Sequence, residues 1–212
     1  MLLSLSSVTA ESILRGDFVE SLPELYATKH VVENNSHHTH QIVFDHLVKT
    51  MRAMDKLTAD QAVLLRAEGT QQKFSLPLTD ILRLTALFHD IGKTNTTAQR
   101  AGDTITFPGH EAAGADLLQN TILPRFEIAS PERTYIVQLV REHFTLHALT
   151  DETNLLSERF VAFKQNYSRL ALGLTFLVMA DLYGSDLESA DQTRFSQKIL
   201  FLQNQLRDWR ME

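Results

Sequence analysis

Histidine and aspartate interrupt the apolar stretches of this sequence at four separate places. His89 and Asp90 end one apolar run, and His46, His143 and Asp181 each lie within or directly after another. A buried carboxylate without a cation is very costly, so aspartate in such surroundings often faces a metal ion or a basic side chain. These residues are therefore candidate metal ligands, although each histidine could also be an ordinary core residue with its hydrogen bonds satisfied, and each aspartate a helix-end residue that reaches solvent.

The available donor atoms restrict the kind of metal site. The chain has nine histidines and no cysteine, which excludes disulfides, thiolate catalysis and Cys-based zinc sites. Imidazole and carboxylate ligands together suit one or two divalent ions of Mn, Mg, Fe or Co. Ions held in this way activate water and neutralise the charge of a phosphate group. The residue types thus favour a metal-dependent hydrolysis.

Apolar residues recur at helical spacing along most of the chain, which predicts an all-α bundle of seven or eight helices. The helices that would carry or adjoin the candidate ligands span about 39–57, 78–91, 110–122, 130–143 and 169–183. Other helices are expected within 8–28, 151–166 and 190–209, and residues 58–65 are expected to continue as helix after 39–57. Gly102-Asp103 separates two short runs and predicts a turn, or a small two-stranded ribbon near 99–107. No linker or repeat is evident, so we expect one domain over 1–212.

The composition narrows the class of protein. The net charge is −6, with 43% hydrophobic and 22% charged residues, as in ordinary globular domains. An acidic chain is a poor partner for nucleic acid, although a small basic pocket for phosphate remains compatible with it. No stretch has the length of a membrane span, and the start lacks the pattern of a signal peptide. We therefore expect a cytoplasmic protein that does not contact a membrane.

The candidate ligands occur in a familiar order. His46, then His89-Asp90, then Asp181 resembles the defining pattern of the HD superfamily of metal-dependent phosphohydrolases. The stretches at 37–46, 89–93, 107–111, 141–143 and 180–184 also resemble successive blocks of the HD module of bacterial tRNA nucleotidyltransferases. This resemblance covers about residues 37–186, the expected core, and implies an all-α fold.

The resemblance also implies roles for single residues. Asp90 would both bind metal and orient the attacking water, and Lys93 would contact the substrate phosphate, as could Arg141. The implied ligands of a first ion are His46, His89, Asp90 and Asp181. His110 and His143 match the histidines of members that hold a second ion.

The resemblance leaves substrate and reaction class open. No nucleotidyltransferase head fits before residue 37, so tRNA end repair is not expected. The favoured interpretation is hydrolysis of a phosphoester in a nucleotide or a similar small molecule. The alternatives are an HD-fold di-iron oxygenase and a non-catalytic regulatory or RNA-associated module. The last amphipathic helix, which includes Trp209, could pack on its own core or form a homodimer.

Four further histidines have no role in this scheme. His37, His38 and His147 are expected to be loop or helix-end residues. His40 is the first candidate for an exception, because it lies next to the start of the helix that carries His46.

Overall fold

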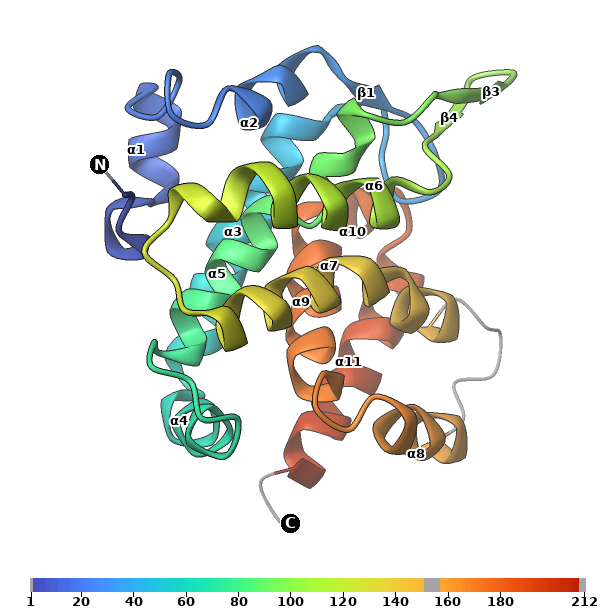
Figure 1. Cartoon of the computed structure of the whole chain (residues 1–212). Coiled ribbons are helices and arrows are strands. Elements are labelled where there is room, and N and C mark those ends of the chain that lie inside the picture. The colour runs from blue at the N-terminus through green and yellow to red at the C-terminus, as the bar shows by residue number, and fades with distance from the viewer. Residues whose placement is uncertain (1, 151–156, 210–212) are drawn as a thin grey trace.

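The computed structural model describes residues 2–150 and 157–209, and helices dominate this part of the chain (Figure 1). The predicted all-α fold is confirmed. More helices form than predicted because short turns of helix also occur between the long ones. The α-helices are α1 (Ala10–Arg15), α2 (Pro23–Ala27), α3 (Val43–Ala59), α4 (Ala62–Gln71), α5 (Leu78–Phe88), α6 (His110–Leu117), α7 (Ser130–Thr150), α8 (Ser157–Asn166), α9 (Ala171–Gly184), α10 (Leu187–Ala190) and α11 (Gln192–Trp209).

Helix α9 lies at the centre of the bundle. Nearly all of its residues are buried, which explains why its sequence is apolar on every side. Helix α3 packs along both α9 and α5, while α7 packs against α9, α5 and α6. The helices that carry the candidate ligands are therefore neighbours in space.

Two small antiparallel ribbons accompany the helices. Strand β1 (Val32–Glu33) pairs with β2 (Gln41–Ile42), and β3 (Gln99–Ala101) pairs with β4 (Thr104–Thr106). The second ribbon is the one predicted near 99–107, and it projects from the bundle in Figure 1. Backbone hydrogen bonds between Asn34 and Ile105 join the two ribbons.

Several helix boundaries differ from the sequence-based expectation. Helix α3 begins at Val43 rather than near residue 39, because residues 41–42 pair as a strand. Helix α7 continues to Thr150, one to two turns beyond the expected end at residue 143. The expected start of α8 falls at residues 151–156, which lie outside the described part of the chain. No helix within 2–150 and 157–209 is both long enough and apolar enough to cross a membrane.

Two glycines allow helices to approach closely. A Cβ atom on Gly92 would overlap the His110 carbonyl oxygen and the Gly114 backbone nitrogen. A Cβ on Gly184 would overlap Thr50 Oγ1, where α9 meets α3. Only glycine fits at such contacts, so these positions fix the spacing of the elements that carry His110, His46 and the neighbouring ligands.

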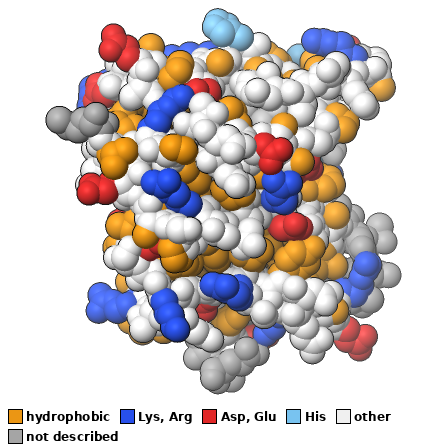
Figure 2. All heavy atoms as spheres, viewed as in Figure 1, with side chains coloured by type: hydrophobic (Ala, Val, Ile, Leu, Met, Phe, Trp, Pro, Cys, Tyr) orange, Lys and Arg blue, Asp and Glu red, His pale blue; other side chains and the backbone are white. Residues whose placement is uncertain are grey.

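The surface carries both signs of charge. On the face shown in Figure 2, Lys and Arg side chains are intermingled with Asp and Glu and with small apolar areas. This face therefore does not resemble the basic stripe of a nucleic-acid-binding protein.

Candidate metal centre

Histidine and aspartate side chains from five segments converge between α3, α5, α6, α7 and α9. The structure brings together all of the metal ligands that the resemblance implies. His46 lies on α3, His89 and Asp90 directly follow α5, His110 begins α6, His143 lies on α7, and Asp181 lies on α9.

The first group of donor atoms surrounds the imidazoles of His46 and His89. Their Nε2 atoms are 3.2 Å apart. Asp90 Oδ2 lies 3.4 Å from the His46 nitrogen and 3.3 Å from that of His89. Asp181 Oδ1 lies 2.9 and 3.5 Å from the same two nitrogens. Two carboxylates and two imidazoles thus face a common point.

The second group lies on the other side of the Asp90 carboxylate. Asp90 Oδ1 is 2.9 Å from His110 Nε2 and 3.6 Å from His143 Nε2, and these two nitrogens are 3.3 Å apart. In each of the sets His46, His89, Asp90 and Asp90, His110, His143, one donor atom per residue lies within 4.8 Å of the others. Asp90 therefore belongs to both sets, with one oxygen directed to each.

Backbone carbonyls orient three of the imidazole rings. His89, His110 and His143 each direct Nδ1 at the carbonyl oxygen three residues earlier, at 2.9, 2.8 and 2.7 Å. A carbonyl only accepts, so Nδ1 must carry the proton and donate it. Such a hydrogen bond fixes the tautomer in which Nε2 offers its lone pair to a metal.

The site is buried and strongly charged. His46 and His89 are fully buried and Asp90 is 3% exposed. Burial lowers the pKa of both imidazoles, but Asp181 and Asp90 outweigh it and raise the pKa of His46 to about 9 and that of His89 to about 10. Burial raises the pKa of Asp90, yet Lys93 and His89 hold it well below its usual range. Without a metal, protons therefore supply the positive charge that these carboxylates require.

The donor set fits a divalent ion. Asp181 Oδ1 and His46 Nδ1 are buried, and neither has a hydrogen-bond partner among the described residues. Asp181 Oδ1 has no hydrogen-bond partner even though His46 Nε2 lies 2.9 Å away, so the imidazole nitrogen does not point along a lone pair of this oxygen. Atoms that are close without being mutually aligned are typical of ligands that share a third partner, and imidazole with carboxylate suits Mn, Fe, Co or Mg.

Lys93 lies beside the metal ligands rather than on the surface. Its Nζ atom is 2.6 Å from Asp90 Oδ2 and 2.6 Å from Glu33 Oε2, and its side chain is almost completely buried. Burial alone would lower the Lys93 pKa, but the two carboxylates raise it. Glu33 was not anticipated from the sequence, because a single acid in a two-residue strand carries no periodic signal.

Two of the unassigned histidines contact the ligands directly. His147 Nε2 lies 2.6 Å from Asp181 Oδ2, and the His38 ring packs edge-on against His46, with centroids 4.7 Å apart. Burial lowers the pKa of His38 to about 4, so this ring is neutral. The i, i+4 spacing of His143 and His147 would have indicated a shared face if α7 had been predicted at its full length.

Two other residues lie away from the centre. His40 is exposed and has a left-handed backbone with φ 49°, so the expectation that it would be the exceptional histidine is not supported by its position. Arg141, expected as a possible phosphate contact, lies on the outer face of α7 with its guanidinium 2.7 Å from Asp116. It does not line the pocket that leads to the metal ligands.

That pocket has a volume of about 490 Å³, within the range of small-molecule sites. Asp90, His110, His143 and Asp181 form part of its lining, and Lys93 is its only Lys or Arg among the described residues. Phe107 and the half-exposed Phe144 add apolar surface. The ligands are thus reachable by a small polar molecule with an apolar part.

A family model for the HD domain matches residues 43–170. The chain belongs to the HD domain family. A search of curated proteins gave no match. The matched part of this HD domain includes every candidate ligand except Asp181, which lies beyond its end but contacts His46 and His89 in the structure.

Family membership and the His/Asp groups together indicate a metal-dependent module of the hydrolase type, with ligands suited to a divalent ion. The finer resemblance to the HD module of tRNA nucleotidyltransferases stays a prediction.

Proposed function

We propose that the protein is a metal-dependent phosphohydrolase that cleaves a phosphoester of a nucleotide or a related small molecule. The observation that carries the proposal is the position of Asp90 between two histidine pairs. Its Oδ2 atom faces His46 and His89, while its Oδ1 atom faces His110 and His143. A carboxylate shared in this way could hold two ions close together, as hydrolysis with two ions needs.

Divalent ions bound at these residues would supply an activated water and positive charge for the phosphate. The protein supplies the geometry. Carbonyl hydrogen bonds hold the rings of His89, His110 and His143, so their Nε2 atoms need no rearrangement when an ion binds. Lys93 keeps Asp90 ionised and adds a fixed positive charge beside the pocket, where it can also attract a phosphate.

The shape of the pocket supports a small substrate. Its lining combines the apolar rings of Phe107 and Phe144 with the polar candidate ligands Asp90, His110, His143 and Asp181. A nucleotide has the matching division, with an apolar base and a charged phosphate. The entire pocket is small, and its single Lys or Arg among the described residues provides little attraction for a long polyanion.

Activity of the metal-loaded protein tests the proposal. Protein reconstituted with Mn²⁺, Fe²⁺, Co²⁺ or Mg²⁺ is assayed against nucleoside mono-, di- and triphosphates, cyclic nucleotides and p-nitrophenyl phosphate. We expect phosphate-ester cleavage by at least one metal form. Loss of both His89 and Asp90 by the double change to Ala should lower turnover by more than about 100-fold and remove bound metal, since ligand loss exceeds the effect of outer-shell changes.

The exposed His30 provides a matched control, because His30→Ala removes a histidine that does not line the pocket. This variant should keep both metal and turnover. Unchanged metal content in the double variant would refute the assigned site. Absence of cleavage across the whole panel with every metal would refute the phosphohydrolase proposal, and oxygen-dependent turnover of an iron form would favour the oxygenase alternative.

A further inference from the structure

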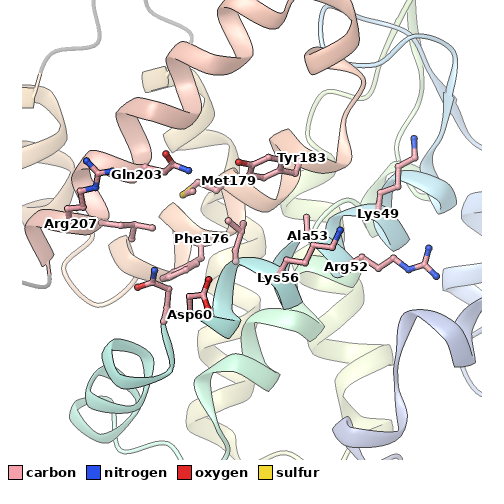
Figure 3. Close-up of a pocket in the computed structure, with 13 residues that line it drawn as sticks. Lys49, Arg52, Ala53, Lys56, Asp60, Phe176, Met179, Tyr183, Gln203 and Arg207 are labelled. Atoms are coloured by element: carbon pink, nitrogen blue, oxygen red, sulfur yellow. The ribbon is translucent and has the colours of Figure 1, made fainter.

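A second pocket lies between α3, α9 and α11 and shares no lining residue with the metal pocket among the residues that the structure describes. Its volume is about 660 Å³, larger than that of the metal pocket (Figure 3). Phe176, Met179 and Leu206 are buried and give it an apolar floor. A concave apolar surface of this size is typical of a ligand site.

Basic side chains lie toward both ends of this pocket. Lys49, Arg52 and Lys56 come from α3, and Arg207 comes from α11 at the other end of the pocket in Figure 3. Asp60 is the only acidic residue that the described part of the chain contributes to the lining. The chain as a whole carries a net charge of −6, so a concentration of cations around one apolar cavity runs against the bulk composition.

The three cations of α3 form a row. They are spaced i, i+3 and i+7, which places them on one face of the helix over about 10 Å. Lys49 is 3.7 Å from Asp186 and Arg52 is 3.2 Å from Glu11, both at half-exposed positions where ion pairs contribute little. Within residues 2–150 and 157–209, Lys56 and Arg207 make no ion pair at all.

We propose that this pocket is a second binding site, specific for a nucleoside polyphosphate. A row of cations matches the negative charges along a di- or triphosphate. A ligand with a single carboxylate would neutralise only one of these cations. The base would lie on the apolar floor beside Tyr183, which is partly exposed at the pocket. Gln203 offers an amide group for its polar edge.

The two sites use opposite faces of α9. Met179 and Tyr183 each stand two positions from Asp181, so their side chains point away from the metal ligand. A nucleotide in the second pocket would therefore be separated from the metal centre by the thickness of α9, and its binding should not require the metal ligands.

The test uses the full chain and the β,γ-imido analogue of ATP, which resists cleavage of the terminal phosphate. Binding is followed by calorimetry and by fluorescence of Trp209, the only tryptophan, which lies at the end of α11. We expect affinity to rise from AMP through ADP to the triphosphate analogue. Lys56→Glu should weaken binding of the analogue by at least tenfold, because it replaces attraction by repulsion.

Arg66→Glu is the matched control, since it reverses one exposed charge on α4 outside the pocket. It should leave binding unchanged. Asp90→Asn in the metal pocket should leave intact the part of the binding that Lys56→Glu weakens. Circular dichroism verifies that each variant is folded. The proposal is overturned if the analogue does not bind, if Lys56→Glu and Arg66→Glu behave alike, or if Asp90→Asn abolishes binding. Equal affinity for inorganic triphosphate would also overturn it, because the base would then contribute nothing.

Discussion

At the scale of single residues, the centre depends on hydrogen bonds made before any ion arrives. The Nδ1–H groups of His89, His110 and His143 donate to backbone carbonyls, which leaves each Nε2 directed at the site. His46 differs, because its Nδ1 has no partner among the described residues. Packing against His38 and the buried wall of α3 must orient this ring instead.

The charge balance around Lys93 leads to a prediction. Lys93 is the shared partner of the buried carboxylates of Asp90 and Glu33. Lys93→Met should lower the free energy of unfolding by about 3–5 kcal/mol, because it leaves the buried Glu33 carboxylate without its cation and removes one of the cations beside Asp90. Adding Glu33→Gln to this variant should recover part of the loss. Urea denaturation measures both, and a double variant no more stable than Lys93→Met would contradict this view of the cluster.

At the scale of elements, the helices could be predicted more fully than the site. The apolar spacing in α5, α9 and α11 indicates helices because burial of one face, or of all faces, leaves a clear pattern. The end of α7 could not be predicted in the same way, since two of its buried residues after His143 are the polar His147 and Thr150, which interrupt the apolar pattern. Glu33 lies in the two-residue strand β1 and His38 lies in irregular backbone, and only tertiary contacts bring them to the ligands.

The contact between the turn after α5 and the start of α6 can be tested. Gly92→Ala would place a Cβ in overlap with the His110 carbonyl oxygen. We expect a loss of roughly 3 kcal/mol in unfolding free energy, the upper end of the range for overpacking, and weaker retention of metal at His110. Gly69→Ala is the control, because a Cβ on this α4 residue would make only ordinary contacts with Leu78 of α5, and alanine favours a helix. Equal stability of the two variants would show that the close contact is not required.

At the scale of the whole molecule, the ligands could be predicted from the family pattern, because their order along the chain is itself the signal. The sharing of Asp90 between two groups could not be predicted in this way, since it depends on the packing of α6 and α7 around one carboxylate. The second pocket could not be predicted from the sequence either, because its cations come from helices far apart in the chain.

The proton balance of the whole protein should change when metal binds. In the metal-free protein the raised pKa values of His46 and His89, about 9 and 10, keep both imidazoles protonated at neutral pH. Metal must displace these protons, so affinity should rise with pH between 6 and 8, by roughly tenfold per unit for each proton released. Calorimetry in two buffers of different ionisation enthalpy measures the release, and identical heats in both buffers would contradict it.

The distribution of the ligands along the chain has a consequence for unfolding. His46, His89 and Asp181 belong to segments separated by long stretches of sequence. An ion that joins them acts as a removable cross-link, closing large loops in the same manner as a disulfide in a protein that has no cysteine. If some ligands remain bound as the chain opens, the ion restricts the unfolded ensemble as well as completing the native site. The same bound metal would then both stabilise the fold as a cross-link and take part in the reaction.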